Sequence, residues 1–227
     1  IGAASGSAAA AAGTVAAQRI AFGSGDGTLV FNHTAPRASR YVFSPYLTGN
    51  GVVEHLAGST EFTGTNSASA IFNGTVDVTG GSLYINGLLG DVVNRSASIN
   101  VSSAGLLGGS GTIAGNVGVA SGGTISPGNS IGTLTIDGNL TMDAGSTYEV
   151  EVLPGSTSSD LIAVTGTAAI NGGTVSHIGM NGTYPAISTY TILTAAGGVS
   201  GRFDAVTSNY AFLASSLGYT ANSVTLS

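Results

Sequence analysis

The sequence contains no cysteine, no tryptophan and no lysine, and the basic side chains among its 227 residues are five arginines. These arginines are scattered along the chain, at positions 19, 37, 40, 95 and 202. Against 11 acidic residues they leave a formal net charge of -6. A surface that binds nucleic acid needs clustered cations to neutralise phosphates, so the composition argues against nucleic acid as a partner.

The absence of cysteine also means that no disulfide can staple the fold. A cytosolic protein needs none, and a secreted protein without them must rely on its core. The chain also lacks the run of about 18 apolar residues that a membrane helix requires. Residues 1–18 are rich in alanine, but they lack the basic and bulky apolar regions of a signal peptide. Since no initiator methionine precedes them, we expect the sequence to be a fragment of a longer protein.

Charged residues are scarce as well, at 7% of the chain against roughly 25% in an ordinary soluble domain. Glycine occurs 37 times, and the mean hydropathy of +0.37 is too high for a disordered chain. The remainder is dominated by Ala, Ser, Thr, Val and Asn, which favour short strands and tight turns. The composition therefore predicts an all-β fold.

A repeat is the strongest signal in the sequence. Five similar segments begin 23, 18, 23 and 28 residues apart, and each has an apolar residue, a glycine corner and another apolar residue. A period of 20–25 residues with short strands predicts a β-solenoid, whose coils stack about 4.8 Å apart. An antiparallel β-sandwich is the alternative, but it does not explain a recurring corner. The segments begin at Val78, Val101, Val119, Met142 and Ile170.

The two ends depart from this repeat. We expect residues 1–20 to be an irregular or truncated first coil, and residues 21–104 to form regular coils. Residues 184–227 are richer in aromatic side chains and suit a cap, which a solenoid needs because its last coil otherwise exposes sheet edges. The aromatic residues of this expected cap are Tyr184, Tyr190, Phe203, Tyr210, Phe212 and Tyr219.

Several ordered motifs resemble one known family. The runs Leu29–Thr34 and His55–Gly64 are similar to its coil repeats, and the most specific series is Gly108–Ile113, Ser126–Ile136 and Gly145–Val152. Over roughly residues 20–227 the sequence resembles the C-terminal passenger region of bacterial type V autotransporters.

The resemblance implies a right-handed, single-stranded parallel β-helix with a C-terminal β-hairpin cap. It implies export through a C-terminal outer-membrane β-barrel translocator to the bacterial cell surface or beyond it. Residues 105–227 resemble the autochaperone region, which folds first and templates the rest. The partner that this implies is a host cell surface or a receptor protein, contacted by a virulence factor or adhesin.

Two motifs imitate enzyme signatures. Gly128–Gly132 matches the G-x-S-x-G elbow of serine hydrolases, and Ser130, Asp160 and His177 follow in the order of a triad. That elbow requires a helix after the serine, whereas the sequence predicts a strand there and a Gly/Asn turn between coils. Gly109–Ala114 imitates a dinucleotide fingerprint, again without the helical pattern that must follow.

The histidines, acidic residues and asparagines allow further expectations. His33 and His55 are 22 residues apart and could be neighbours on adjacent coils, where a surface or corner ladder is favoured over a metal site. We expect Glu149 and Glu151 to point outward into solvent. Asn73, Asn116 and Asn139 are expected to hydrogen-bond backbone groups across the turns.

The sequence thus predicts a stalk and folding nucleus rather than an enzyme, with no catalytic, cofactor or metal residue assigned. The alternative is a β-helical polysaccharide-degrading enzyme, which gathers acidic and basic side chains on one long face. A trimeric tailspike-like spacer is a third possibility. Scattered arginines and missing lysines make the enzyme's face hard to assemble.

Overall fold

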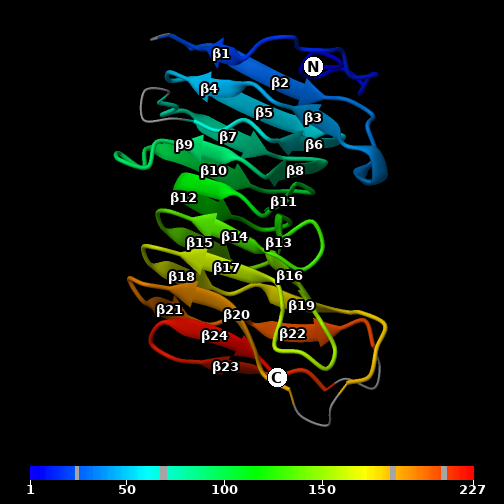
Figure 1. Cartoon of the computed structure of the whole chain (residues 1–227), viewed down its shortest axis with the longest axis vertical. Coiled ribbons are helices and arrows are strands. Elements are labelled where there is room, and N and C mark those ends of the chain that lie inside the picture. Colours follow the sequence, from blue (N-terminus) through cyan, green and yellow to red (C-terminus); the bar gives the residue numbers. More distant parts are fainter. Residues whose placement is uncertain (24–25, 67–70, 185–187, 211–213) are drawn as a thin grey trace.

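The chain forms a tall stack of short strands, seen in a computed structural model that describes all residues except 24–25, 67–70, 185–187 and 211–213. The two termini lie at opposite ends of the stack (Figure 1). Within the described residues the only helical segment is the three-residue η1 (Arg37–Ser39). Accordingly, no helix there is long and apolar enough to cross a membrane.

Two faces of the stack are columns of parallel strands. The first face contains β2 (Thr28–Asn32), β5 (Val52–Ala57), β7 (Thr75–Val78), β10 (Ala97–Val101), β12 (Thr112–Val119), β15 (Leu140–Asp143), β18 (Ala168–Asn171) and β21 (Val199–Gly201). The second face contains β3 (Tyr41–Phe43), β6 (Ser59–Phe62), β8 (Ser82–Ile85), β11 (Leu106–Gly109), β13 (Thr124–Pro127), β16 (Thr147–Val152), β19 (Thr174–Gly179) and β22 (Ala205–Ser208).

The third face shares the long strand β12 with the first. It contains β9 (Leu88–Gly90), the start of β12, β14 (Thr133–Ile136), β17 (Leu161–Val164) and β20 (Tyr190–Ala195), followed by β24 (Ser223–Leu226) and β23 (Leu217–Tyr219). A separate pair of strands, β1 (Arg19–Ala21) and β4 (Tyr46–Thr48), is parallel too. The chain is therefore a parallel β-helix, and the antiparallel sandwich is excluded.

The sequence repeat coincides with the coils. Val101 pairs with Val78 and with Val119, Val119 pairs with Met142, and Met142 pairs with Ile170, so the five segment starts form one column. All five side chains are buried. The predicted period is confirmed, and many strands, such as β7, β15 and β16, bury one residue in two as a sheet packed on one side requires.

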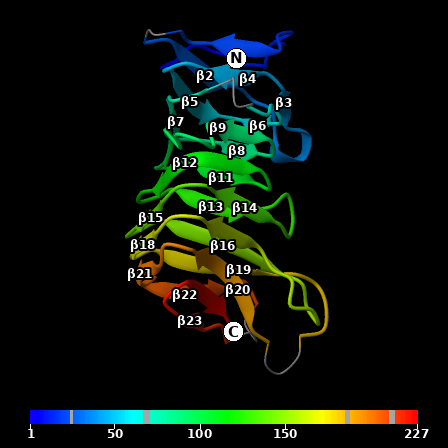
Figure 2. The ribbon, with the colours of Figure 1, turned by 60° about the vertical axis from the view of Figure 1, so that its left-hand side comes forward.

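The variable spacing is explained by loops that leave the stack. Thr124 pairs with Thr147, 23 residues on, whereas Thr133 pairs with Leu161, 28 residues on. The extra residues lie in the connection between β16 and β17, which projects from the stack in Figures 1 and 2 and is closed by an antiparallel bridge from Val152 to Ser159. The connection between β2 and β3, which carries η1, projects from the same side higher up.

The interior is a continuous apolar column with aromatic side chains concentrated in the first coils. The ring centroids of Phe31 and Phe43 are 5.2 Å apart, and those of Phe43 and Phe62 are 4.8 Å apart. Aliphatic residues fill the middle coils. Tyr148 is fully buried farther along and donates its hydroxyl to the carbonyl of Ile192, and burial raises the pKa of this phenol.

The end of the chain closes the last coil. β24 pairs antiparallel with β20 on one side and with β23 on the other, whereas the other pairings of strands with strands in the described residues are parallel. The predicted C-terminal β-hairpin cap is thus confirmed for Leu217–Leu226, and Phe212 lies outside the described residues. At the other end, residues 1–18 are irregular and touch the first coil through bridges at Gly2 and Ala10.

Candidate functional site

The serine hydrolase elbow does not lead into a helix. Ser130 is exposed in the turn that joins β13 to β14, so a strand follows it. The carboxylate of Asp160 accepts hydrogen bonds from the backbone N–H groups of Gly132, at 3.0 Å, and Glu151, at 2.8 Å. His177 hydrogen-bonds instead to the hydroxyl of Ser215, through Nδ1 at 3.0 Å. Within the described residues, therefore, no triad is hydrogen-bonded together.

Asp160 has a structural role: it connects two segments of backbone, and the apparent triad gave no indication of this. It is 1% exposed, and its two oxygens tie the β16–β17 loop to the turn at Gly132. Burial raises the pKa of this carboxyl to about 7, and the nearby acids Glu151 and Glu149 add to the rise. The two backbone N–H groups oppose it because they favour the charged form.

The apparent dinucleotide motif also lacks its structural context. Gly109 bridges to Gly128 of the next coil, and the residues from Thr112 onward form the eight-residue strand β12. A phosphate-binding glycine loop requires a helix N-terminus at that point, because the helix supplies the N–H donors. Gly109–Ala114 is thus a corner of the coil.

His33 and His55 are brought together as expected, but inside the stack. Their rings are 6.2 Å apart, and they are 1% and 0% exposed, so the expected surface or corner position was wrong. The hydroxyl of Thr60 lies between them, 2.8 Å from Nε2 of His33 and 2.9 Å from Nε2 of His55. Alternation could have indicated their burial, because His33 follows the inward Phe31 and His55 the inward Val53 at a spacing of two.

The hydrogen bonds of this pair define one direction of donation. Nδ1 of His33 accepts the N–H of Ala35 at 3.2 Å, so its proton is on Nε2 and is donated to Thr60. Thr60 then donates to Nε2 of His55, whose Nδ1–H donates to the carbonyl of Gly80 at 2.8 Å. Both rings are neutral in this network. The described residues contain no group of three or more metal-ligating side chains here or elsewhere.

The outward acids and the corner asparagines follow the expectations in part. Glu149 and Glu151 alternate along β16, but both are half-buried, and Oε2 of Glu151 is buried without a hydrogen-bond partner among the described residues. The oxygen of Asn116 accepts the N–H of Asn139 at 2.9 Å. In the same way, the side-chain oxygen of Asn139 accepts the N–H of Thr167 on the next coil at 2.9 Å, which confirms the expected bonds to the backbone for both asparagines.

Asn73 differs from the other two corner asparagines. Its side-chain oxygen accepts a hydrogen bond from the hydroxyl of Ser96, one coil later, so its ladder contact is to a side chain. The expected bond to the backbone is therefore wrong at this position. Ser96 takes that place because its hydroxyl can reach across the same interval between coils.

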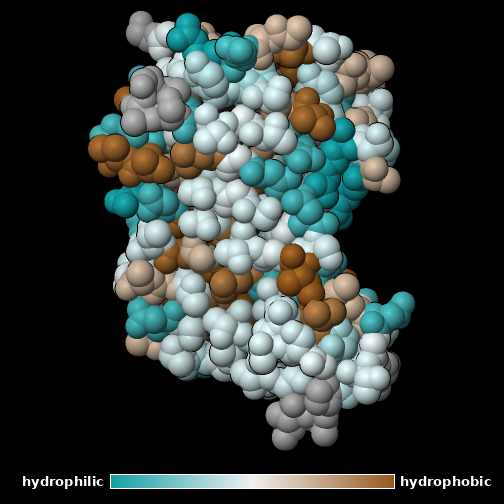
Figure 3. Space-filling view, viewed as in Figure 1, coloured by the Kyte–Doolittle hydropathy of each residue, from teal (hydrophilic) through white to brown (hydrophobic). Residues whose placement is uncertain are grey.

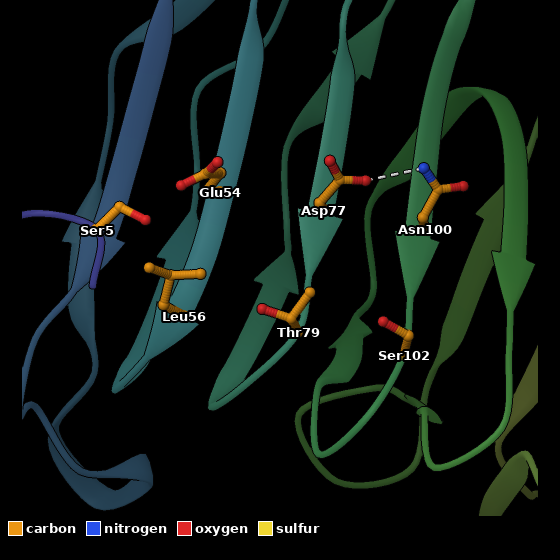
Figure 4. A pocket seen from close by; sticks show the side chains of 7 residues that line it. All are labelled: Ser5, Glu54, Leu56, Asp77, Thr79, Asn100 and Ser102. Carbon is orange, nitrogen blue, oxygen red and sulfur yellow. Dashed lines mark hydrogen bonds between the residues drawn. The ribbon is translucent and has the colours of Figure 1, made fainter. Parts of the chain in front are cut away.

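Among the polar pockets on the outside of the stack, one is acidic. Glu54, Asp77 and Asn100 are register partners on β5, β7 and β10, and their side chains point to the same side (Figure 4). The amide of Asn100 donates to Asp77 at 2.8 Å. Together with Ser5, these residues line a pocket of about 240 Å³.

A second pocket, called the arginine groove below, was not found from the sequence. It has a volume of about 230 Å³ and is lined mainly by Arg37, Arg40, Tyr84, Asn129, Ser130 and Glu151. The η1 segment folds over the outside of the second face and places both arginines on Tyr84 of β8. Figure 3 shows hydrophilic side chains gathered near β6, β8 and β11, where the outline is hollowed.

Tyr84 organises this groove. Its hydroxyl accepts the Nε–H of Arg37 at 2.7 Å, and the guanidinium carbon of Arg40 lies 3.4 Å from its ring centroid. Gly108 on the neighbouring strand leaves room for the ring, since a Cβ there would lie 2.8 Å from it. Stacked and hydrogen-bonded in this way, the arginines are held by a rigid partner.

Neighbouring coils complete the wall of the groove. Arg40 donates through Nη1 to the side-chain oxygen of Asn129, and the amide of Asn129 donates to Asn86 at 3.0 Å. Because Arg40 and Asn129 are 89 residues apart, sequence spacing gives no sign of this contact. The arginines are scattered in sequence, but two of them share one site.

Comparison with known proteins adds no assignment. No protein-family model matches the chain, and no curated protein sequence is similar to it. The function must therefore be inferred from the β-helix, its cap and the groove on its side.

Proposed function

We propose that this chain is a passenger segment of an autotransporter, displayed at the bacterial cell surface or released from it. There it acts as a β-helical stalk and folding nucleus in a virulence factor or adhesin that contacts a host cell surface or receptor. The observation that supports this best is the uninterrupted parallel stack closed at one end by an antiparallel cap. Such a stack presents a long surface, and its cap covers the edge of β20, the last parallel strand of the third face.

The C-terminal coils have the features of a folding template. They contain the eight-residue strand β12 and three strands of six residues, β16, β19 and β20. β16 and β19 pair along their full length. Once such a coil has formed, each further coil gains a ready-made edge, so growth from the cap costs less than forming a new nucleus. In the full-length protein the partner for export is the C-terminal outer-membrane β-barrel translocator.

Surface display is tested on intact bacteria that produce the full-length protein. An antibody raised against this chain should label unpermeabilised cells, and added protease should remove the signal. A periplasmic protein serves as the control and should be labelled only after permeabilisation. Labelling of this chain that also requires permeabilisation contradicts the proposal.

A polysaccharide-degrading enzyme is the second candidate, and the arginine groove is the observation that favours it. The groove combines two guanidinium groups, which can bind an acidic sugar, with the carboxylate of Glu151, which can serve as a general acid or base. Incubation with a panel of acidic polysaccharides decides between the two. New chain ends that vanish in Glu151→Gln support the enzyme, and unchanged polymer length supports the stalk.

A further inference from the structure

The arginine groove brings together two of the five arginines of this acidic chain. Arg95 is paired with Asp137 at 2.8 Å, and Arg202 lies over the ring of Tyr219, with its guanidinium carbon 4.5 Å from the centroid. Arg37 and Arg40 line the arginine groove together, whereas Arg95 and Arg202 each line a different pocket. The whole chain has a net charge of -6, so the two arginines attract an anion to the groove, whereas most of the surrounding surface repels it.

Both guanidinium groups keep donors for a ligand. Arg37 uses Nε and Arg40 uses Nη1, so the two terminal nitrogens of Arg37 and Nη2 of Arg40 have no protein acceptor among the described residues. Nε of Arg40 is buried and also has no hydrogen-bond partner there. A planar guanidinium with free N–H groups matches a carboxylate in two parallel hydrogen bonds.

The groove also offers acceptors and mixed polar groups. Oε2 of Glu151 is buried and has no hydrogen-bond partner among the described residues, so a ligand that brings a donor to it would satisfy this acceptor. Ser130 and Asn129 line the same groove; the hydroxyl of Ser130 can donate and accept, whereas Asn129 already bonds to Arg40 and Asn86. The hydroxyl groups of a ligand are suitable donors to Glu151, because they can hydrogen-bond to a carboxylate without carrying a positive charge.

We propose that the arginine groove binds one carboxylated sugar residue of an acidic polysaccharide. The carboxylate of the sugar binds Arg37 and Arg40, and its ring hydroxyls donate to Glu151 and bond with Asn129 and Ser130. A volume of about 230 Å³ is below the roughly 300–1,000 Å³ of drug-sized pockets and suits a single ring. Glu151 and the net charge of -6 disfavour a dianionic phosphate or sulfate. The site goes beyond the stalk function and does not depend on surface display.

The proposal is tested by titrating the purified chain with glucuronate and following backbone amide signals by NMR. Glucuronate should shift signals of Tyr84 and Asn129, whereas glucose, which lacks the carboxylate, should bind at least tenfold more weakly. Acetate, which lacks the hydroxyls, should also bind at least tenfold more weakly. It serves as the control for the carboxylate of an acidic peptide side chain. Sulfate should not compete at equal concentration.

Variants locate the site. Arg37→Gln and Glu151→Gln should each raise the dissociation constant for glucuronate at least tenfold. Arg19→Gln removes one positive charge from an exposed side chain on β1, outside the groove, and should leave the dissociation constant for glucuronate unchanged. Unchanged affinity in both groove variants, or acetate binding as tightly as glucuronate, overturns the proposal. Because Arg37 is exposed and Glu151→Gln keeps the side-chain shape, both variants should retain the unfolding midpoint of the parent.

Discussion

His55 is a buried base whose network requires the neutral ring. Burial lowers the pKa of His55 to about 4, and the carbonyl of Gly80 opposes this shift. Burial also lowers the pKa of His33 on the other side of Thr60. A proton added to Nε2 of His55 would face the Thr60 hydroxyl that now donates to it. Protonation thus breaks a bond as well as charging the interior.

Acid should therefore destabilise the fold through His55. In the unfolded chain its pKa is about 6.5, so between pH 6.5 and 4 the unfolded state takes up a proton that the folded state refuses. His55 should lower the free energy of unfolding by about 3 kcal/mol as pH drops through this range, whereas Asp160, whose pKa is raised to about 7, acts in the opposite sense because the folded state takes up its proton first. Urea unfolding at a series of pH values measures it. His55→Gln should be less stable than the parent at pH 7, and this difference should shrink by about 3 kcal/mol between pH 6.5 and 4, because Asp160 contributes equally to both proteins; a difference that does not change with pH contradicts this assignment.

At the scale of the elements, the corners between strands decide how closely the coils approach. Gly81 lies in the corner before β8 with φ of 67°, and a Cβ on it would lie 2.2 Å from the carbonyl oxygen of Gly58 one coil below. That same oxygen accepts the N–H of Ser82 at 2.8 Å. The corner therefore needs both the left-handed conformation and the missing side chain of glycine.

Gly81→Ala should destabilise the chain by at least about 2 kcal/mol, since it adds a steric clash to the cost of a positive φ. Gly13→Ala is the matched control, because φ there is not positive and nothing lies within 4 Å of the added Cβ. We expect its effect to be within about 0.5 kcal/mol. Thermal unfolding of both variants compares them. A loss in Gly81→Ala no larger than in the control argues against tight corners.

The elements also show what the sequence could predict and what it could not. The repeat identified the column from Val78 to Ile170, because inward apolar positions and glycine corners recur along the chain itself. The arginine groove depends on Arg40 crossing to Asn129, and such a contact depends on how far η1 projects. The number of residues in the connection between β2 and β3 does not by itself determine how far η1 extends from the stack. A loop of one coil can contact residues of distant coils, and local sequence patterns do not predict such contacts.

The whole molecule is a one-dimensional stack in which each coil contacts mainly its neighbours. Stability in such a stack is a sum of coil and interface contributions, and folding can spread from one end. The cap gives the C-terminal end an antiparallel partner that the chain itself supplies. We propose that residues 105–227 fold first and template the coils of residues 21–104.

Folding and unfolding rates of two matched variants test that claim most directly. Ile99→Val in β10 and Ile170→Val in β18 each remove one methyl group from the buried side of the first face. Each should cost about 0.5–1.5 kcal/mol. We predict that Ile170→Val slows folding by nearly its full cost, whereas Ile99→Val leaves the folding rate unchanged and speeds unfolding. Slower folding in Ile99→Val, with Ile170→Val affecting only unfolding, would contradict the claim.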